Sequence, residues 1–255
     1  MNFHRTYRPD DLSTEAFDYQ VLYDGESCVI TICRAPAATD GPRPHRHTSD
    51  QLYYVIEGAM ELEMAGEDQT VGAGSTVFIP ADTPHTNRYA GPELHLDIIA
   101  PAPSHYEPIA RPVDDHGAGS AAQPASFVLR AGSGRPREVL PGFTTTPLAG
   151  RGSGCGSLSL RVNEIEPGHE PLPWHIHDFD QFYFILDGQM QVEVASERFV
   201  ASPLDLVALP AGVPHRNWNA GPGVERHLAM LVPEPEAGSP ADLEVEFRVT
   251  GSTFG

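Results

Sequence analysis

A chain of 255 residues with a formal net charge of −19, whose 16 basic side chains are all arginine, repels phosphate groups. Nucleic acids and anionic membranes are therefore excluded as partners. The lack of lysine also excludes Schiff-base chemistry by a lysine side chain.

The N-terminal segment, residues 1–17, has no apolar run after its basic residues, so no signal peptide is expected. No stretch approaches the roughly 20 apolar residues of a membrane-spanning helix. The cysteines, Cys28, Cys33 and Cys155, form no CxxC pair, and such a sparse, odd set fits a reducing compartment. Together these features predict a cytoplasmic protein.

Short β-strands and turns are predicted along the whole chain. Apolar and polar residues alternate over 60–64 and again over 190–194, as in half-buried strands. Gly58 and Gly188 each divide two extended runs and predict hairpin turns. Residues 101–126, rich in Pro, Gly and Ala, have the composition of a linker. The alternating segment Leu243–Val249 predicts one more edge strand.

The chain matches itself at an offset of 130 residues: between residues 45–92 and 175–222, 19 of 48 positions are identical without a gap. Ordinary composition would give about three such matches. We therefore expect a duplicated domain. The predicted division is an N-terminal domain over 1–108, a linker over 109–126 and a C-terminal domain over 127–255.

Six histidines and two glutamines occupy matching places in the two copies. Residues two apart on a strand share a face, so the pair in each His-Xaa-His and the Gln four residues further on point the same way. A third His follows a Pro-rich turn in each copy. Three imidazoles with an amide oxygen form a metal site with positions left for substrate. The predicted ligands are His45, His47, Gln51 and His85 in the first copy, and His175, His177, Gln181 and His215 in the second. The other six histidines have no counterpart at this offset and are expected in surface or core positions.

The spacing HxHx3Qx6G, followed by PxxxPHxN, resembles the two motifs of the cupin superfamily, and two copies resemble a bicupin. The resemblance implies an all-β fold of two tandem cupin barrels, each a double-stranded β-helix or jelly roll. Leu204 and Asp82 stand where the second cupin motif usually has glycine. Gln51 and Gln181 stand where most metal cupins have glutamate. Paired HxHx3Q motifs resemble the bicupin isomerase of the bacilysin pathway, and the domain pattern also resembles the quercetin dioxygenases.

A neutral glutamine ligand leaves a divalent metal its full charge, which favours an anionic substrate such as an enolate or a 2-oxo acid. Gln181 and Tyr183 are the candidate catalytic residues, and Tyr53 is the equivalent of Tyr183. Aromatic residues near the second ligand set, Trp174, Phe179 and Trp218, predict an apolar second pocket, where the chemistry is expected.

Three functions are compatible with these features. The first is a non-haem Fe(II)-type dioxygenase acting on a small aromatic or enolisable metabolite. The second is a metal-assisted isomerase or lyase of a small oxo-acid, and the third is a non-catalytic protein that binds a small molecule or metal. Fe(II) is the expected metal, with Mn, Ni, Co and Zn as alternatives. The expected partners are a small-molecule substrate and, in a homodimer, a second copy of the chain.

Overall fold

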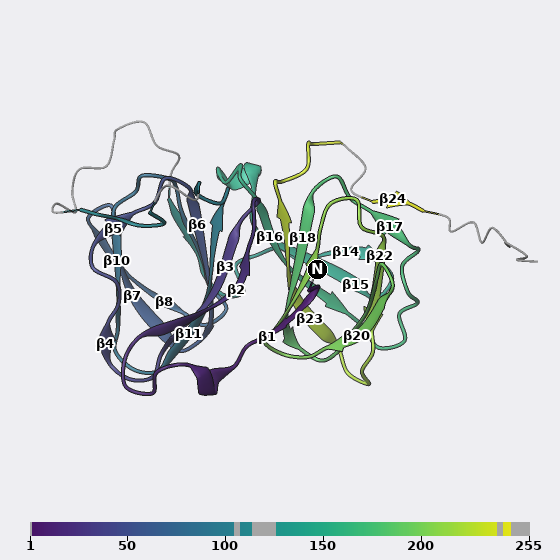
Figure 1. Ribbon diagram of the computed structural model, residues 1–255, viewed down its shortest axis with the longest axis horizontal. Coiled ribbons are helices and arrows are strands. Elements are labelled where there is room, and N and C mark those ends of the chain that lie inside the picture. The colour runs from purple at the N-terminus through teal and green to yellow at the C-terminus, as the bar shows by residue number, and fades with distance from the viewer. Residues whose placement is uncertain (1, 105–107, 114–125, 239–241, 246–255) are drawn as a thin grey trace, which may run out of the picture.

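The computed structural model describes residues 2–104, 108–113, 126–238 and 242–245. These residues form two β-barrels that lie side by side (Figure 1), as the repeat and the alternating patterns predicted. Apart from the strands, the described part of the chain contains only two short 3-10 turns, η1 (Pro9–Asp11) and η2 (Arg151–Ser153). None of its helices is long and apolar enough to cross a membrane.

The first barrel is built from two antiparallel sheets. One has the order β13 (Phe127–Leu129), β9 (Thr76–Ile79), β6 (Asp50–Glu57), β11 (Glu93–Ala100), β3 (Val29–Ala35), β2 (Asp18–Asp24). The other has the order β12 (Arg111–Pro112), β5 (His45–Arg46), β10 (His85–Tyr89), β7 (Ala59–Met64), β8 (Glu67–Gly72), with β4 (Thr39–Asp40) also paired to β10.

The second barrel repeats this plan. Its larger sheet has the order β1 (His4–Thr6), β21 (Asp205–Leu209), β18 (Asp180–Asp187), β23 (Glu225–Val232), β16 (Ser159–Ile165), β15 (Phe143–Ala149), β14 (Arg137–Leu140). Its smaller sheet has the order β20 (Glu197–Ala201), β19 (Met190–Val194), β22 (His215–Asn219), β17 (His175–Ile176), β24 (Leu243–Glu244).

Two short strands are exchanged between the barrels. β1, from the start of the chain, pairs with β21 of the second barrel, and β13 pairs with β9 of the first. The predicted linker is also partly structured, because β12 pairs with β5 beside the first histidine pair. The predicted domain boundaries at residues 108 and 127 stay a prediction. The strand pairing shows in addition that each barrel includes one strand from the other side of these boundaries.

Strand alternation explains how the barrels meet. In β6, Tyr53 and Val55 face the barrel interior, whereas Leu52 and Tyr54 face the other barrel. The larger sheet of each barrel supplies such outward apolar residues, and they form one core cluster shared by both. β6 and β18 are therefore buried on both faces, and this fixes their register firmly.

Gly58 and Gly188 occupy corners rather than the predicted hairpin turns. β6 and β7, which flank Gly58, lie in different sheets of the first barrel, so the chain crosses between sheets there. Both glycines have positive φ, +73° and +75°. A Cβ at Gly58 would collide with the Pro92 carbonyl oxygen, which explains why only glycine fits this corner.

The predicted edge strand near the C-terminus is confirmed at Leu243–Glu244, which pair with β17. The remainder of that segment, residues 246–249, lies outside the described residues.

Candidate metal centres

Each barrel brings the three predicted histidines of its copy together. In the first, His45 and His85 are direct cross-strand partners on β5 and β10, and His47 follows two residues after His45. The second barrel repeats this pairing with His175 and His215. Within each triad the available ligand atoms all lie within 4.8 Å of one another. Two donors on one ion, each at about 2.1 Å, are about 3–4 Å apart, so small side-chain movements suffice to bind a metal.

Backbone carbonyl oxygens fix how the imidazoles of the first triad point. The Nδ1 atoms of His45, His47 and His85 lie 2.7, 2.5 and 2.9 Å from the carbonyl oxygens of Arg43, Ile109 and Thr83. A proton on Nδ1 leaves the lone pair on Nε2 free for a metal, as is usual for ligating histidines. The Nε2 atoms of His47 and His85 are buried without a hydrogen-bond partner among the described residues, which is the state expected of metal ligands.

The second triad is held in a similar way. His175 Nδ1 lies 2.8 Å from the Pro173 carbonyl, and His215 Nδ1 lies 2.9 Å from that of Val213. His215 Nε2 is buried and unpartnered among the described residues. His177 differs from His47, because its Nδ1 lies 3.6 Å from a carboxylate oxygen of Asp242.

Burial disfavours the charged form of four of these imidazoles. It lowers the pKa of His47 to about 4 and that of His215 to about 3, and it also lowers the pKa values of His45 and His85. Neutral imidazole is the form that binds a metal, so these four histidines need no deprotonation near neutral pH.

The glutamines lie beside the triads, as predicted. Gln51 donates both hydrogen bonds of its amide nitrogen to Asp97, at 3.0 and 3.1 Å from the two carboxylate oxygens. Its Oε1 is buried and has no partner among the described residues, so the hydrogen bonds to Asp97 leave the amide oxygen free, and its role as a ligand stays a prediction. In the second barrel, Gln181 Oε1 lies 2.9 Å from His177 Nε2, about the spacing of two donors on one ion.

Tyr53 and Tyr183 face the barrel interiors on the same strands as the glutamines. Burial raises the pKa of Tyr183, so its hydroxyl stays protonated near neutral pH and can donate a hydrogen bond but cannot act as a base. This hydroxyl lies 3.4 Å from Asn217 Oδ1. Tyr183 lines the second cavity with the ligands, and its catalytic role stays a prediction.

The two cavities differ in a way opposite to the prediction. The first, about 310 Å³, is walled mainly by apolar residues, among them Phe17, Val21, Val29, Ile99 and Ile109. The second, about 180 Å³, is the more polar one and is lined by Arg137, Thr145, Arg161 and Asn163 besides the ligands.

The prediction of an apolar second pocket was wrong because the side chains of Trp174 and Trp218 lie elsewhere. Arg216 stacks over both tryptophan rings, with its guanidinium carbon 5.1 and 5.6 Å from their centroids, and neither ring lines the cavity. Only Phe179 reaches it, stacked on His177 with ring centroids 4.7 Å apart.

A second pair of histidines was missed at the sequence level. His95 on β11 and His227 on β23 are equivalent, because their cross-strand partners, Val55 and Ile185, occupy the same position in the two copies. Each lies 2.9 Å from a buried glutamate two residues earlier, Glu93 or Glu225. Burial by itself would lower the pKa of His95, but Glu93 raises it overall. A search for the repeated Glu-Xaa-His, at an offset of 132 rather than 130, would have found them.

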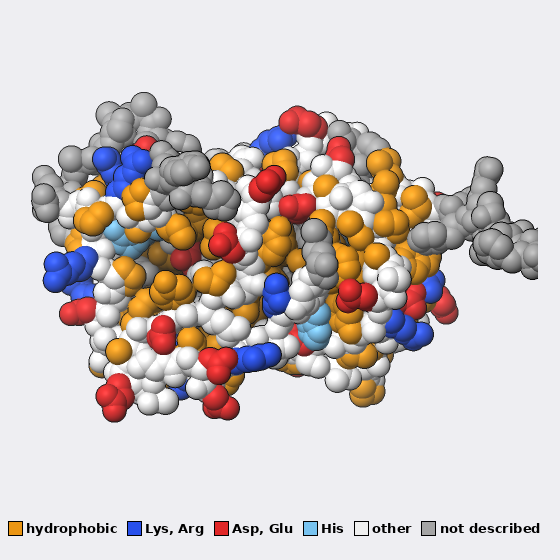
Figure 2. All heavy atoms as spheres, in the orientation of Figure 1, with side chains coloured by type: hydrophobic (Ala, Val, Ile, Leu, Met, Phe, Trp, Pro, Cys, Tyr) orange, Lys and Arg blue, Asp and Glu red, His pale blue; other side chains and the backbone are white. Residues whose placement is uncertain are grey.

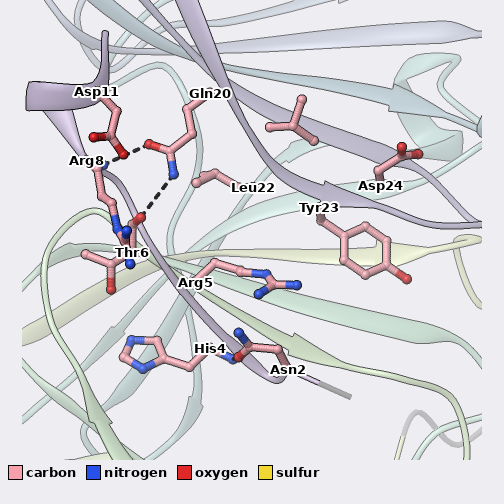
Figure 3. A pocket seen from close by; sticks show the side chains of 11 residues that line it. Asn2, His4, Arg5, Thr6, Arg8, Asp11, Gln20, Leu22, Tyr23 and Asp24 are labelled. Carbon is pink, nitrogen blue, oxygen red and sulfur yellow. Dashed lines mark hydrogen bonds between the residues drawn. The ribbon is translucent and has the colours of Figure 1, made fainter.

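A larger hollow of about 590 Å³ lies between the N-terminal segment and β2, away from the triads (Figure 3). Gln20 bridges the two segments there, accepting a hydrogen bond from the Arg8 amide at 2.8 Å and donating one to the Thr6 carbonyl at 3.1 Å. No predicted metal ligand lines it. The acidic side chains expected from the net charge lie at several separate places on the face seen in Figure 2.

A family model described as a cupin domain matches residues 31–100 and 161–230, which are 70 residues each and together 140 of 255. The two matched segments coincide with the cores of the two barrels.

Curated relatives match only short stretches. Polyketide synthase CurC of Streptomyces cyaneus is 36% identical over 66 residues, 24% of this chain and 43% of CurC. Dimethylsulfoniopropionate lyase DddW of Ruegeria pomeroyi is 39% identical over 51 residues, 20% of this chain and 33% of DddW. The chain thus spans less than half the length of each of these two relatives.

Solved structures resemble the whole chain. A putative glyoxylate-induced protein from Pseudomonas aeruginosa has a TM-score of 0.65 at 19% identity, over 92% of this chain and 84% of that one. Oxalate decarboxylase from Lactobacillus farciminis, in complex with formate, has a TM-score of 0.70 at 15% identity, over 96% of this chain and 89% of that one. At these identities the likeness shows a shared fold of two barrels.

Proposed function

Because this chain belongs to the cupin family, with one cupin domain in each barrel, we propose that it is a metal-dependent enzyme acting on a small enolisable or aromatic metabolite. The observation that carries the proposal is the pair of histidine triads. All six histidines are buried, and two of each triad line a cavity large enough for a small molecule. A binding protein would need only one such site.

The donor sets fit a divalent metal. In the first barrel three atoms, His47 Nε2, His85 Nε2 and Gln51 Oε1, are buried and unpartnered among the described residues. A bound divalent metal would supply Lewis acidity and, for iron, redox chemistry. The chain's own residues hold the ligands in place through backbone carbonyls and Asp97, and the Tyr183 hydroxyl can donate a hydrogen bond in the second cavity.

The first candidate reaction is dioxygenation with Fe(II). Three imidazoles and one amide oxygen are fewer donors than iron commonly takes, so a substrate and O₂ could both be accommodated. The burial of both triads supports this assignment, because water is largely excluded from the reacting groups.

The second candidate is an isomerase or lyase that uses the metal only as a Lewis acid. Neutral glutamine supports it, since four neutral ligands leave the metal its whole charge to polarise a carbonyl or stabilise an enolate. The relatives named above as a lyase and a decarboxylase are compatible with this class of reaction.

Metal content and oxygen consumption separate these candidates. Purified protein should bind up to two divalent ions per chain, and replacing His175 and His177 together with Ala should remove about half of them. Unchanged metal content in that double variant would exclude the second site. A dioxygenase should lose turnover when zinc replaces iron and should consume one O₂ per substrate. Full turnover of zinc-loaded protein without oxygen would instead establish the isomerase or lyase.

A further inference from the structure

Beside each candidate metal centre, three residues on adjacent strands pair with one another across the larger sheet. These two rows of residues are equivalent in position, but one contains an acidic and the other a basic side chain. In the first barrel, Tyr53 pairs with Asp97, which pairs with Thr31. In the second barrel the same row consists of Tyr183, Ala229 and Arg161. A partly buried carboxylate next to the first centre is thus replaced by a methyl group, and an arginine appears one strand further on.

Arg161 occupies an inward position of β16. Its neighbours in sequence, Leu160 and Val162, face the other barrel and belong to the shared core. Strand alternation therefore directs the Arg161 side chain into the second barrel, where it lines the same cavity as His175, His177 and Gln181. A charged side chain at an inward barrel position is costly unless it is paired, so it indicates a ligand or partner.

Two carboxylates, those of Glu234 and Asp242, lie near Arg161 and favour its charged form, but neither pairs with it directly. Its one hydrogen bond among the described residues runs from Nη2 to Ser159 Oγ, at 3.0 Å. No ion pair joins it to a carboxylate in the part of the chain that the structure describes. By contrast, Asp97 in the first barrel is already engaged with Gln51.

Arg161 also stands between the metal cavity and the outside. A neighbouring hollow of about 460 Å³ shares Arg137, Thr145 and Arg161 with the metal cavity. Two arginines therefore lie where the two spaces meet, on a chain whose net charge is −19. An anion entering by this route would meet positive charge before it reached the histidines.

We propose that the second barrel binds a small organic acid, with its carboxylate on Arg161 and a second oxygen directed to the histidine triad. This inference rests on the proposed function and adds the substrate class and the barrel that binds it. Guanidinium and carboxylate match in charge and in hydrogen-bond geometry. The cavity of about 180 Å³ restricts the ligand to a few carbon atoms, since one water takes about 30 Å³. Each cavity is lined by one aspartate, Asp97 or Asp242, but only the second is also lined by arginines, Arg137 and Arg161, and the first has mainly apolar walls.

The test uses full-length protein loaded with Co(II), with pyruvate as the probe and methyl pyruvate as its uncharged control. Binding is measured by calorimetry after the metal content of each variant has been determined. Arg161→Gln should weaken pyruvate binding about 10- to 100-fold, the usual effect of losing hydrogen bonds between charged groups. Arg161→Lys should retain part of the affinity, and methyl pyruvate should bind weakly throughout.

Two further variants keep the test specific. Arg216→Gln removes an arginine from the same barrel outside the cavity and should bind pyruvate like the wild type. Ala229→Asp places a carboxylate in the row of Arg161, as in the first barrel, and should weaken pyruvate binding about as much as Arg161→Gln.

The outcomes separate this inference from the proposed function. Wild-type affinity in Arg161→Gln, equal affinity for methyl pyruvate, or no pyruvate binding by metal-loaded wild type would overturn the inference and leave the proposed enzyme in place. A wild-type chain that binds no metal would overturn the proposed function. In that case, loss of pyruvate binding to metal-free protein on Arg161→Gln would still support an acid-binding role for Arg161.

Discussion

At the scale of single residues, the two glutamines predicted as ligands are not equivalent. The amide of Gln51 donates hydrogen bonds to the Asp97 carboxylate. In the second barrel the residue equivalent to Asp97 is Ala229, and Gln181 Oε1 lies 2.9 Å from His177 Nε2 instead. The sequence motif is the same in both copies, so the difference arises from a neighbouring strand.

Replacing each glutamine with glutamate should therefore have different effects: the first variant should lose stability, and the second should keep its metal affinity. Gln51→Glu would bring a second carboxylate to about 3 Å from Asp97 and lose two hydrogen bonds to a charged group, which should cost about 1–3 kcal/mol of stability. Gln181→Glu meets no such carboxylate and should retain or tighten the metal. Thermal unfolding of metal-free protein measures the first effect, and a chelator competition measures the second. An equal loss of stability in both variants would contradict the role given to Asp97.

Backbone conformation at the departures from the cupin motif is also a single-residue matter. Gly74 and Gly212 have positive φ, and so do their counterparts in the other copy, Leu204 at 71° and Asp82 at 62°. Both turns thus require a left-handed backbone conformation at this position in each barrel, whether or not the residue is glycine.

Asp82→Gly should accordingly stabilise the protein by up to about 1 kcal/mol, because glycine adopts this conformation without strain. Asp82→Val is the matched control and should destabilise it, since a β-branched side chain is least compatible with positive φ. Urea unfolding of the three proteins provides the measurement. A variant with valine as stable as the one with glycine would show that the turn relaxes.

What the sequence could predict follows from how far apart the residues lie along the chain. His45, His47 and Gln51 form one short motif, which was enough to predict that they lie together. Strand alternation was not the reason, because His45 lies on β5 and Gln51 on β6, and these strands belong to different sheets. Asp97 and Arg161 could not be predicted, because their place beside the ligands depends on the register of strands far away in sequence. His95 and His227 were missed because two extra residues before β23 shift the repeat.

At the scale of elements, the short strand β1 belongs to the first half of the sequence but is held on the second barrel by side-chain contacts. Phe3 belongs to the interior cluster of the second barrel, and His4 Nε2 lies 2.8 Å from Asp205 Oδ2. Burial by itself would raise the pKa of Asp205, but hydrogen bonds from His4 and from the Ser202 backbone lower it overall. A lowered pKa means that the ionised carboxylate stabilises the folded state.

Asp205→Asn should consequently destabilise the protein by about 1–2 kcal/mol near pH 6. The stabilisation by Asp205 is present above the ordinary aspartate pKa of about 3.9 and is lost as the pH falls through its lowered folded value. The difference in stability between wild type and variant should thus shrink as the pH falls from 6 toward 3. Denaturant unfolding across that range measures it, and a difference that grows in acid would have the wrong sign for this account.

At the scale of the whole molecule, the two barrels share one apolar core. Phe182 of β18 packs edge-on against Tyr23 of β2, with ring centroids 4.6 Å apart. Beside them, Ser27 donates a hydrogen bond of 2.6 Å to Asp180, again between barrels. These contacts couple the folding of one barrel to that of the other.

Phe182→Ala should therefore destabilise both barrels together, by about 3–5 kcal/mol. Calorimetry should show a single transition at lower temperature rather than loss of one barrel alone. Val200→Ala, at a surface position 41% exposed, is the control and should change stability by less than about 0.5 kcal/mol. Two separated transitions in Phe182→Ala would mean that the shared core does not unite the barrels.

The exchanged strands β1 and β13 have a consequence for the gene as well as for the protein. A cut between residues 113 and 126 would leave each half with one strand belonging to the other half and with one bare sheet edge, β9 or β21. Exposed edges invite pairing with other chains, so each half expressed alone should aggregate. Co-expressed halves should instead reassemble, and a first half lacking residues 1–8 should do so less well in a pull-down. Neither half of the duplicated gene can then be lost or replaced on its own, because each encodes a strand that the other barrel needs.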